Sequence, residues 1–192
     1  MNSAQLIQAI VTGDRKSFET LYRSFQRPML AYAIGLLAGD RELAEDAVDE
    51  AFLNIWDNAA GYSGSGSAEG WIRRIVRNKA IDLLRRQKSG RTDQWSPTHD
   101  QIAEKSPSPE EMTAHSNDAL WLQAKLATLP VDQREAVFLC YFEDLSVAAI
   151  ATIANCPEGT VKTRLFHARK ALRGQMVDLM PQTPAIAAQL RA

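Results

Sequence analysis

Hydrophobic residues recur at helical spacing along most of the chain, and no convincing segment alternates in the manner of a β-strand. Residues 17–39 carry two groups of apolar side chains at this spacing, with Pro28 between them. The pattern leaves open whether Pro28 kinks one helix or lies in the first turn of another. We therefore expect an all-α protein.

Two more helices follow in the first half of the chain. Gly39 and Asp40 mark the boundary, after which residues 40–59 repeat apolar side chains every fourth residue. Residues 61–70 are rich in Gly and Ser, which is typical of a loop. A strongly periodic and basic segment, residues 71–88, predicts the third helix.

After Arg91 the composition changes to Pro, Ser and charged residues without periodicity, and the helical pattern resumes near Asn117. Such a stretch is typical of a flexible linker. We expect two small helical domains, residues 1–91 and 116–177, joined by a linker of residues 92–115. The mildly apolar tail, residues 178–192, has no assigned role.

The last helical segment has two different faces. Its apolar stripe is Val161, Leu165, Ala168 and Leu172, while cations, hydrogen-bonding groups and one aromatic ring lie on the other side. A short helix precedes it, with Ser146 as its N-cap and a turn at 155–157. This arrangement predicts a helix-turn-helix whose second helix enters the DNA major groove. The alternative is a solvated amphipathic helix, whose C-terminal cations favour the helix dipole.

Residues 71–88 form a second amphipathic and basic helix. Its packing stripe is Ile72, Val76, Ala80 and Leu83, and the far side carries Arg74, Arg77, Asn78, Ile81, Arg85 and Lys88. This side could follow a nucleic-acid backbone. Tyr62 and Trp71 flank the preceding loop and could stack on an unpaired base. The alternative for Trp71 is packing in the core.

The helix at 40–57 is acidic, with seven carboxylates in and around it against Arg41. An acidic helix beside a basic one cannot bind the same polyanion, so it indicates a protein partner. Asp46, Asp49 and Glu50 could instead share a face and bind a metal, although no His or Cys joins them. We expect no metal and no cofactor.

The net charge and the composition of the chain limit its possible partners and its cellular location. The net charge is −1, so any basic surface for nucleic acid must be local. Cys140 and Cys156 are too few for a disulfide framework. The start of the chain lacks a signal-peptide pattern, and no apolar run reaches the ~18 residues of a membrane span. We expect a cytoplasmic protein without membrane insertion.

Three segments together resemble bacterial RNA polymerase sigma factors of the extracytoplasmic-function (ECF) group. Residues 44–58 and 70–87 resemble region two of that family, and residues 129–173 resemble region four. The resemblance implies a non-enzymatic factor that gives core RNA polymerase its promoter specificity. It also implies contacts with the beta-prime clamp helices and the beta flap of the polymerase, with promoter DNA, and with an anti-sigma factor.

The resemblance implies three groups of site residues. For the minus-thirty-five element they are Lys162, Thr163, Arg164, Phe166, His167 and Lys170. For the minus-ten element they are Tyr62, Trp71, Arg74, Arg77, Asn78, Asp82 and Arg85, with the loop 61–68 holding a flipped base. For the polymerase they are Asp46, Asp49, Glu50, Leu53 and Trp56.

The sequence departs from the family pattern at two positions. Ala68 stands where phenylalanine is frequent, so Tyr62 is expected to form more of the base pocket. His167 stands where arginine is common, which predicts a weaker and pH-sensitive contact.

Two other functions stay open: an operator-binding regulator that uses the C-terminal helix-turn-helix without polymerase, and a metal-dependent enzyme that acts through the acidic cluster. Redox sensing through Cys140 or Cys156 is a further alternative to their packing in the core and in the turn.

Overall fold

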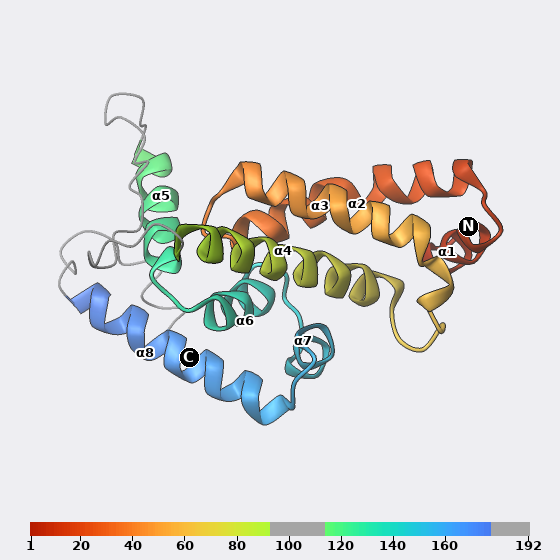
Figure 1. Ribbon diagram of the computed structural model, residues 1–192. Coiled ribbons are helices and arrows are strands. Elements are labelled where there is room, and N and C mark those ends of the chain that lie inside the picture. Colours follow the sequence, from red (N-terminus) through yellow and green to blue (C-terminus); the bar gives the residue numbers. More distant parts are fainter. Residues whose placement is uncertain (93–113, 178–192) are drawn as a thin grey trace.

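The computed structural model describes residues 1–92 and 114–177, and all regular structure in these ranges is helical (Figure 1). The N-terminal domain consists of α1 (Ser3–Val11), α2 (Arg15–Leu36), α3 (Arg41–Asp57), the short 3-10 turn η1 (Ala59–Gly61) and α4 (Ala68–Thr92). The C-terminal domain consists of α5 (Ala114–Ala127), α6 (Val131–Tyr141), α7 (Val147–Ala154) and α8 (Glu158–Val177). The predicted all-α class with two helical domains is confirmed.

Several helix boundaries differ from the expectation. Pro28 lies inside α2, which continues without interruption from Arg15 to Leu36. The helix α4 begins at Ala68 and ends at Thr92, beyond both ends of the predicted segment 71–88, and α8 ends at Val177. The predicted linker lies outside the described residues, apart from its ends, which belong to α4 and α5. The predicted tail lies outside them entirely.

The helix α1 was not predicted, because its nine residues are too few to establish a period. Its start nevertheless carries a local signal. The Asn2 side chain accepts a hydrogen bond from the Gln5 amide, and the Gln5 side chain accepts one from the Asn2 amide, both at 2.9 Å. This reciprocal capping box satisfies two backbone donors at a helix start. Leu6, Ile7 and Ile10 then bury one face of α1.

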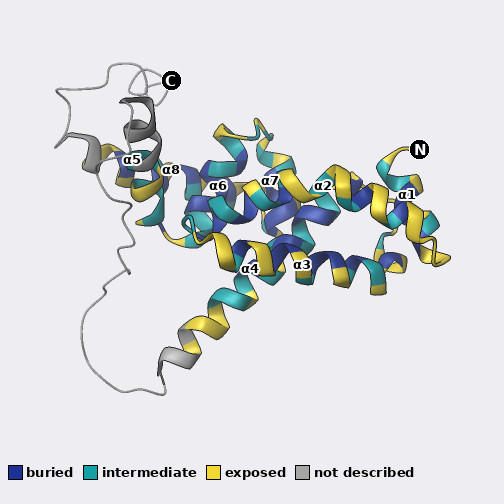
Figure 2. Ribbon diagram, turned by 90° about the horizontal axis from the view of Figure 1, so that it is seen from above, coloured by how far each residue is buried: buried dark blue, intermediate teal, exposed yellow. Residues whose placement is uncertain are grey.

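The core of the N-terminal domain lies where α2, α3 and α4 pack together, with α1 against α2 (Figure 2). Tyr32, Met29, Phe52 and Ile55 are almost completely buried there. The predicted stripe of α4 also packs inward: Ile72, Val76 and Ala80 are buried, and Leu83 is half-buried. Part of the opposite side of α4, at Asn78, Asp82 and Arg85, is exposed to solvent.

The two domains pack directly against each other. The helix α6 contacts α2, and α7 contacts α4, so the C-terminal domain lies along one side of the N-terminal helices (Figure 1). The ring centres of Tyr32 and Phe138 lie 6.1 Å apart across this interface. A Cβ on Gly35 would meet the Phe138 ring, so glycine permits the close approach of α2 and α6. The sequence pattern had predicted two domains joined by a flexible linker and gave no indication of this interface.

Ser146 caps α7 as predicted, because its hydroxyl accepts a hydrogen bond from the Ala149 amide at 3.2 Å. We expect Ser146→Ala to lower the free energy of unfolding by about 1 kcal/mol. Chemical denaturation followed by circular dichroism measures this change. Ser24→Ala is the control, since the Ser24 hydroxyl only donates to the Thr20 carbonyl within α2. An equal loss in both variants would contradict the capping role.

Candidate nucleic-acid interface

The helix-turn-helix is formed by α7, a tight turn and α8. Asn155 ends α7 in the left-handed conformation, with φ of 49°, and Cys156 and Pro157 lead into α8. Asn tolerates this conformation better than most residues, which suits it to a sharp helix end. Val161, Leu165, Ala168 and Leu172 are all buried, so the predicted packing stripe is confirmed.

The outer face of α8 is open to solvent. Lys162, Thr163, His167 and Lys170 are exposed, and Phe166 exposes 59% of its surface. An aromatic ring of that size in solvent, surrounded by cations and hydrogen-bonding groups, is suited to base edges and phosphates. Five of the six residues expected at the minus-thirty-five element therefore share one accessible surface.

Arg164 is the exception on α8. It is half-buried, and its guanidinium forms an ion pair with Asp132 of α6 at 3.2 Å. It also contacts the Cys156 sulfur at 3.5 Å. In this structure Arg164 connects α8 to α6 and to the turn, and its expected role in DNA binding stays a prediction.

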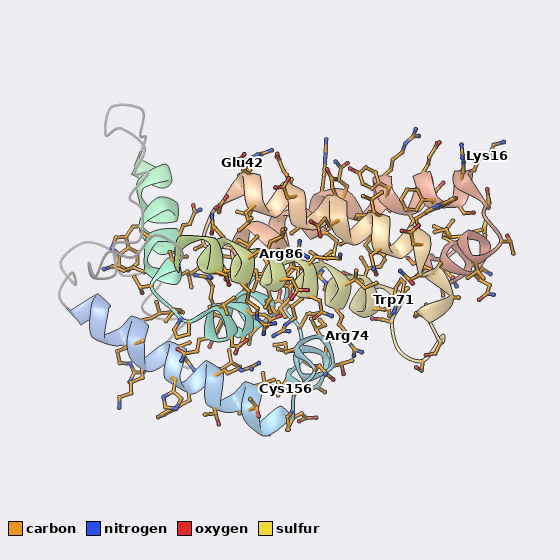
Figure 3. The ribbon with its side chains drawn as sticks, viewed as in Figure 1. Lys16, Glu42, Trp71, Arg74, Arg86 and Cys156 are labelled. Atoms are coloured by element: carbon orange, nitrogen blue, oxygen red, sulfur yellow. The ribbon has the colours of Figure 1, made fainter. Side chains whose placement is uncertain are left out.

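On α4 the expected minus-ten residues divide into two groups. Asn78, Asp82 and Arg85 are exposed along one rim of the helix. Arg74 and Arg77 instead turn toward the C-terminal domain. The Arg74 Nη2 donates to the Thr152 carbonyl of α7 at 2.7 Å, and Figure 3 shows Arg74 between α4 and α7. The Arg77 Nε donates to both carboxylate oxygens of Glu135, at 2.8 and 2.9 Å.

Tyr62 lies at the start of the loop that precedes α4, and Trp71 lies in the first turn of α4. Their ring centres are 5.4 Å apart, and both side chains are half-buried against the core. The Tyr62 hydroxyl donates to the Gly66 carbonyl at 3.1 Å and so holds the loop in a defined shape. Packing of Trp71 in the core is thus present, and stacking of either ring on a base stays a prediction.

The acidic helix α3 also separates into exposed and paired residues. Asp46 and Asp49 are exposed, and Leu53 exposes 64% of its surface beside them. Glu50 forms ion pairs with Lys79 at 3.3 Å and Arg86 at 3.8 Å, so it connects α3 to α4. Trp56 packs edge-on against Phe18 at 5.2 Å between ring centres.

The structure brings together a group of charged residues that the sequence analysis did not identify as a site. We name it the interdomain charge cluster: Tyr32, Arg73, Arg77, Asp132, Glu135 and Glu143. The Tyr32 hydroxyl donates to Glu135 at 2.7 Å, and Arg73 donates to Glu143 at 2.9 Å. A weak signal was available, because Arg134 and Glu135 directly precede the apolar residues 136–141 of α6.

Burial changes the titration of several of these groups. The pKa of Tyr32 is raised well above its ordinary value, mainly by burial and secondly by the nearby charge of Glu135. Burial is the largest single influence on Arg77 and opposes its charged form, but the interactions with Glu135, Tyr32 and Asp132 together outweigh burial and raise the pKa of Arg77. Elsewhere in the C-terminal domain, burial raises the pKa of the Cys140 thiol, which disfavours the reactive thiolate.

Within the described ranges, no group of three or more His, Cys, Asp or Glu side chains is arranged to hold a metal ion. Over the same part of the chain, no helix has the length and apolar character needed to cross a membrane.

Family models match both domains in order: "Sigma-70 region 2" over residues 21–90 and "Sigma-70, region 4" over residues 119–172. The ECF RNA polymerase sigma factor SigM of Mycobacterium tuberculosis is 34% identical over 171 residues, which cover 89% of this chain and 83% of SigM. The ECF RNA polymerase sigma factor SigE of Mycolicibacterium smegmatis is 32% identical over 147 residues. That match covers 77% of this chain and only 57% of SigE.

Two solved structures share the fold. The sigma factor RpoE of Bartonella quintana, in complex with the anti-sigma factor NepR, has a TM-score of 0.67 at 23% identity. That likeness covers 86% of this chain and 99% of RpoE. CnrH, in complex with the cytosolic domain of CnrY, has a TM-score of 0.66 at 18% identity, covering 93% and 99% of the two chains. With both region models and these relatives in agreement, the chain belongs to the ECF group of RNA polymerase sigma factors, which are non-enzymatic transcription initiation factors.

Proposed function

We propose that this chain binds core RNA polymerase and directs it to promoters through two DNA-reading surfaces, one on each domain. The observation that carries the proposal is the shared design of α4 and α8. Each helix buries an apolar stripe in its own domain and exposes a polar or basic row on the other side. Residues 1–91 then recognise the minus-ten element and the polymerase, and residues 116–177 recognise the minus-thirty-five element.

Recognition of the minus-thirty-five element is assigned to the exposed face of α8. Lys162 and Lys170 neutralise phosphates, Thr163 and His167 donate and accept hydrogen bonds, and Phe166 offers an apolar contact. Arg164 joins them if it exchanges its partner Asp132 for DNA. Its present ion pair already orients the guanidinium at the N-terminal half of α8.

Recognition of the minus-ten element is assigned to Asn78, Asp82 and Arg85 on α4, with Arg74 and Arg77 on the neighbouring face. The Arg85 Nη1 and the Asp82 Oδ1 lie 3.6 Å apart, so each side chain orients the other on the exposed rim. The loop closed by Tyr62 and Trp71 would receive an unpaired base, since extrusion of a base costs a few kcal/mol that stacking offsets in part.

Polymerase binding is assigned to the exposed side of α3, where Asp46, Asp49 and Leu53 lie at helical spacing, together with the half-buried Trp56 that follows them. A large exposed leucine among carboxylates suits a protein interface that has an apolar centre and a charged rim. Glu50 contributes indirectly, because its ion pairs fix α3 against α4.

The proposal includes control by an anti-sigma factor, action in the cytoplasm beside the polymerase, and no catalytic activity of its own. Support for the anti-sigma partner comes from the two structural neighbours, whose structures were determined as complexes with NepR and CnrY. Such a partner would cover the polymerase-binding and DNA-binding surfaces at once.

Run-off transcription with core RNA polymerase over a promoter library tests the proposal. Addition of the protein should create start sites that core polymerase does not use by itself. If no new start site appears, the proposal is wrong. The operator-binding alternative would then be favoured, since a regulator of that kind needs no polymerase-binding helix.

Asn78→Ala should change the ranking of minus-ten sequences, with a loss of about tenfold on the preferred one, because one good base contact contributes about 1–3 kcal/mol. The same transcription assay measures this ranking. Gln87→Ala is the matched control, as Gln87 is an exposed amide on the same helix without an assigned role. A ranking that Asn78→Ala leaves unchanged would refute the assignment of Asn78.

A further inference from the structure

The outer side of α8 carries a row of exposed residues, and the first of them is a glycine. The helix lies along the outside of the C-terminal domain (Figure 1). Positions i, i+4, i+7, i+8 and i+11 share one face of a helix, and here they are Gly159, Thr163, Phe166, His167 and Lys170, all of them exposed. We name these five residues the outer row of α8. Four of them are already assigned to the minus-thirty-five element, whereas the glycine has no assigned role.

The fold gives no reason for a glycine at position 159. Its backbone is helical, and its φ is not in the positive range that favours glycine. A Cβ on Gly159 would meet no atom of the protein within 4 Å. By contrast, a Cβ on Gly35 would meet the Phe138 ring, and Gly39 has a φ of 90°. Glycine also makes a helix less stable than alanine does, so Gly159 weakens α8 without improving its packing.

The position of Gly159 along α8 supplies a reason. A helix-turn-helix places the N-terminal residues of its second helix against base edges in the major groove. Gly159 lies in the first turn of α8, ahead of every other member of the outer row. The Thr163 hydroxyl donates to the Gly159 carbonyl at 2.9 Å, so this short side chain is held against its own helix. The row therefore begins with no side chain and continues with a short one, which suits a close approach to a ligand.

We infer that Gly159 is a positioning residue for recognition of the minus-thirty-five element: its missing side chain lets the N-terminal end of α8 enter the major groove deeply enough for Thr163 and Phe166 to reach base edges. This inference rests on the proposed function, which assigns those two residues to DNA. A side chain at position 159 would stand between α8 and the DNA and hold both residues away from the bases. Lys162 and Lys170 have long side chains that reach phosphates from a greater distance. Base recognition should therefore suffer more than phosphate attraction.

Two substitutions in the full-length chain test the role of the missing side chain. Gly159→Ala and Gly159→Leu both introduce a better helix former, and they differ in size. Gly174→Ala and Gly174→Leu are the matched controls. Gly174 lies on the same face of α8, about 22 Å further along the helix axis, and a Cβ there also meets nothing within 4 Å.

Run-off transcription with core RNA polymerase, over promoters randomised in the minus-thirty-five element, measures base recognition. Gly159→Ala should lower use of the preferred minus-thirty-five sequence by about tenfold, which is the effect of losing one good base contact. Gly159→Leu should lower it further, and both should reduce the differences among minus-thirty-five sequences. The ranking of minus-ten sequences should be that of the wild type. The salt dependence of promoter binding by the holoenzyme should also be unchanged, because no charge is altered.

Thermal denaturation followed by circular dichroism separates this role from a structural one. Gly159→Ala should melt about 1–3 °C above the wild type, because alanine favours the helix. Greater stability together with poorer recognition is the expected combination. A residue that serves only the fold would instead lose stability and recognition together. Both Gly174 variants should keep the wild-type ranking of minus-thirty-five sequences.

Three outcomes would overturn the inference. One is a wild-type ranking of minus-thirty-five sequences in Gly159→Ala and Gly159→Leu. Another is a lower melting temperature of Gly159→Ala, which would mean that the glycine serves the fold. The third is an equal loss of recognition in the Gly174 variants, which would mean that any change along α8 has this effect. The wild type separates the two failures: if it creates no start sites the proposed function is wrong, whereas the inference alone is wrong if the wild type and the Gly159 variants choose the same promoters.

Discussion

Leu53→Asp should weaken binding to core RNA polymerase by about 30-fold. A leucine side chain that becomes buried in an interface contributes about 2 kcal/mol, and that free energy corresponds to this change in Kd. The substitution also adds a carboxylate to a surface that already carries Asp46 and Asp49. Since Leu53 is 64% exposed, the fold of the domain should be unaffected. Titration of labelled protein with core polymerase, followed by fluorescence anisotropy, measures the Kd.

Val11→Asp is the matched control for this variant. Val11 is also a large apolar residue in solvent, 43% exposed, at the end of α1 and outside the proposed contact. Single exposed apolar residues are common on protein surfaces and do not by themselves indicate a partner. If Val11→Asp weakens binding as much as Leu53→Asp does, or if Leu53→Asp leaves the Kd unchanged, the assignment of α3 is wrong.

The helical faces were the part of this structure most accessible from the sequence. The stripe of α8 and that of α4 were predicted to pack inward, and Val161, Leu165, Ile72 and Val76 are buried. This succeeds because spacing along one helix determines which residues share a face, whatever the helix packs against. The exposure of Lys162 and its neighbours follows from the same geometry.

The docking of the two domains could not be predicted in this way. Periodicity separates the packing face of α4 from its polar face, but does not reveal that another domain covers part of the polar face. Arg77 therefore reads as a free cation in the sequence, whereas in the structure it is paired with Glu135. A buried ion pair depends on two positions far apart in the chain, and composition and spacing carry no information about that pairing.

Arg134→Ala should lower the free energy of unfolding by about 3 kcal/mol. Arg134 is 6% exposed and makes hydrogen bonds to three backbone carbonyls. Its Nε donates to the Leu36 carbonyl at 2.9 Å, at the C-terminal end of α2, where carbonyls lack partners within the helix. Its Nη1 donates to the Ala127 carbonyl at 3.1 Å, within its own domain. Loss of the guanidinium leaves these acceptors buried and unsatisfied.

One side chain thus stabilises both the C-terminal domain and its contact with α2, and the two effects are separable. Burial lowers the pKa of Arg134, and no carboxylate in the described ranges forms an ion pair with it. The hydrogen bonds to backbone carbonyls therefore compensate for the lost hydration of its guanidinium group. Chemical denaturation should show the loss of stability, and X-ray scattering should show separated domains. Arg169→Ala is the matched control, because Arg169 donates to the Leu165 carbonyl of its own helix at 3.4 Å. An Arg134→Ala variant that unfolds like the wild type and stays compact would contradict both roles. A variant that is destabilised but stays compact would support the role of Arg134 within the C-terminal domain and contradict its role between the domains.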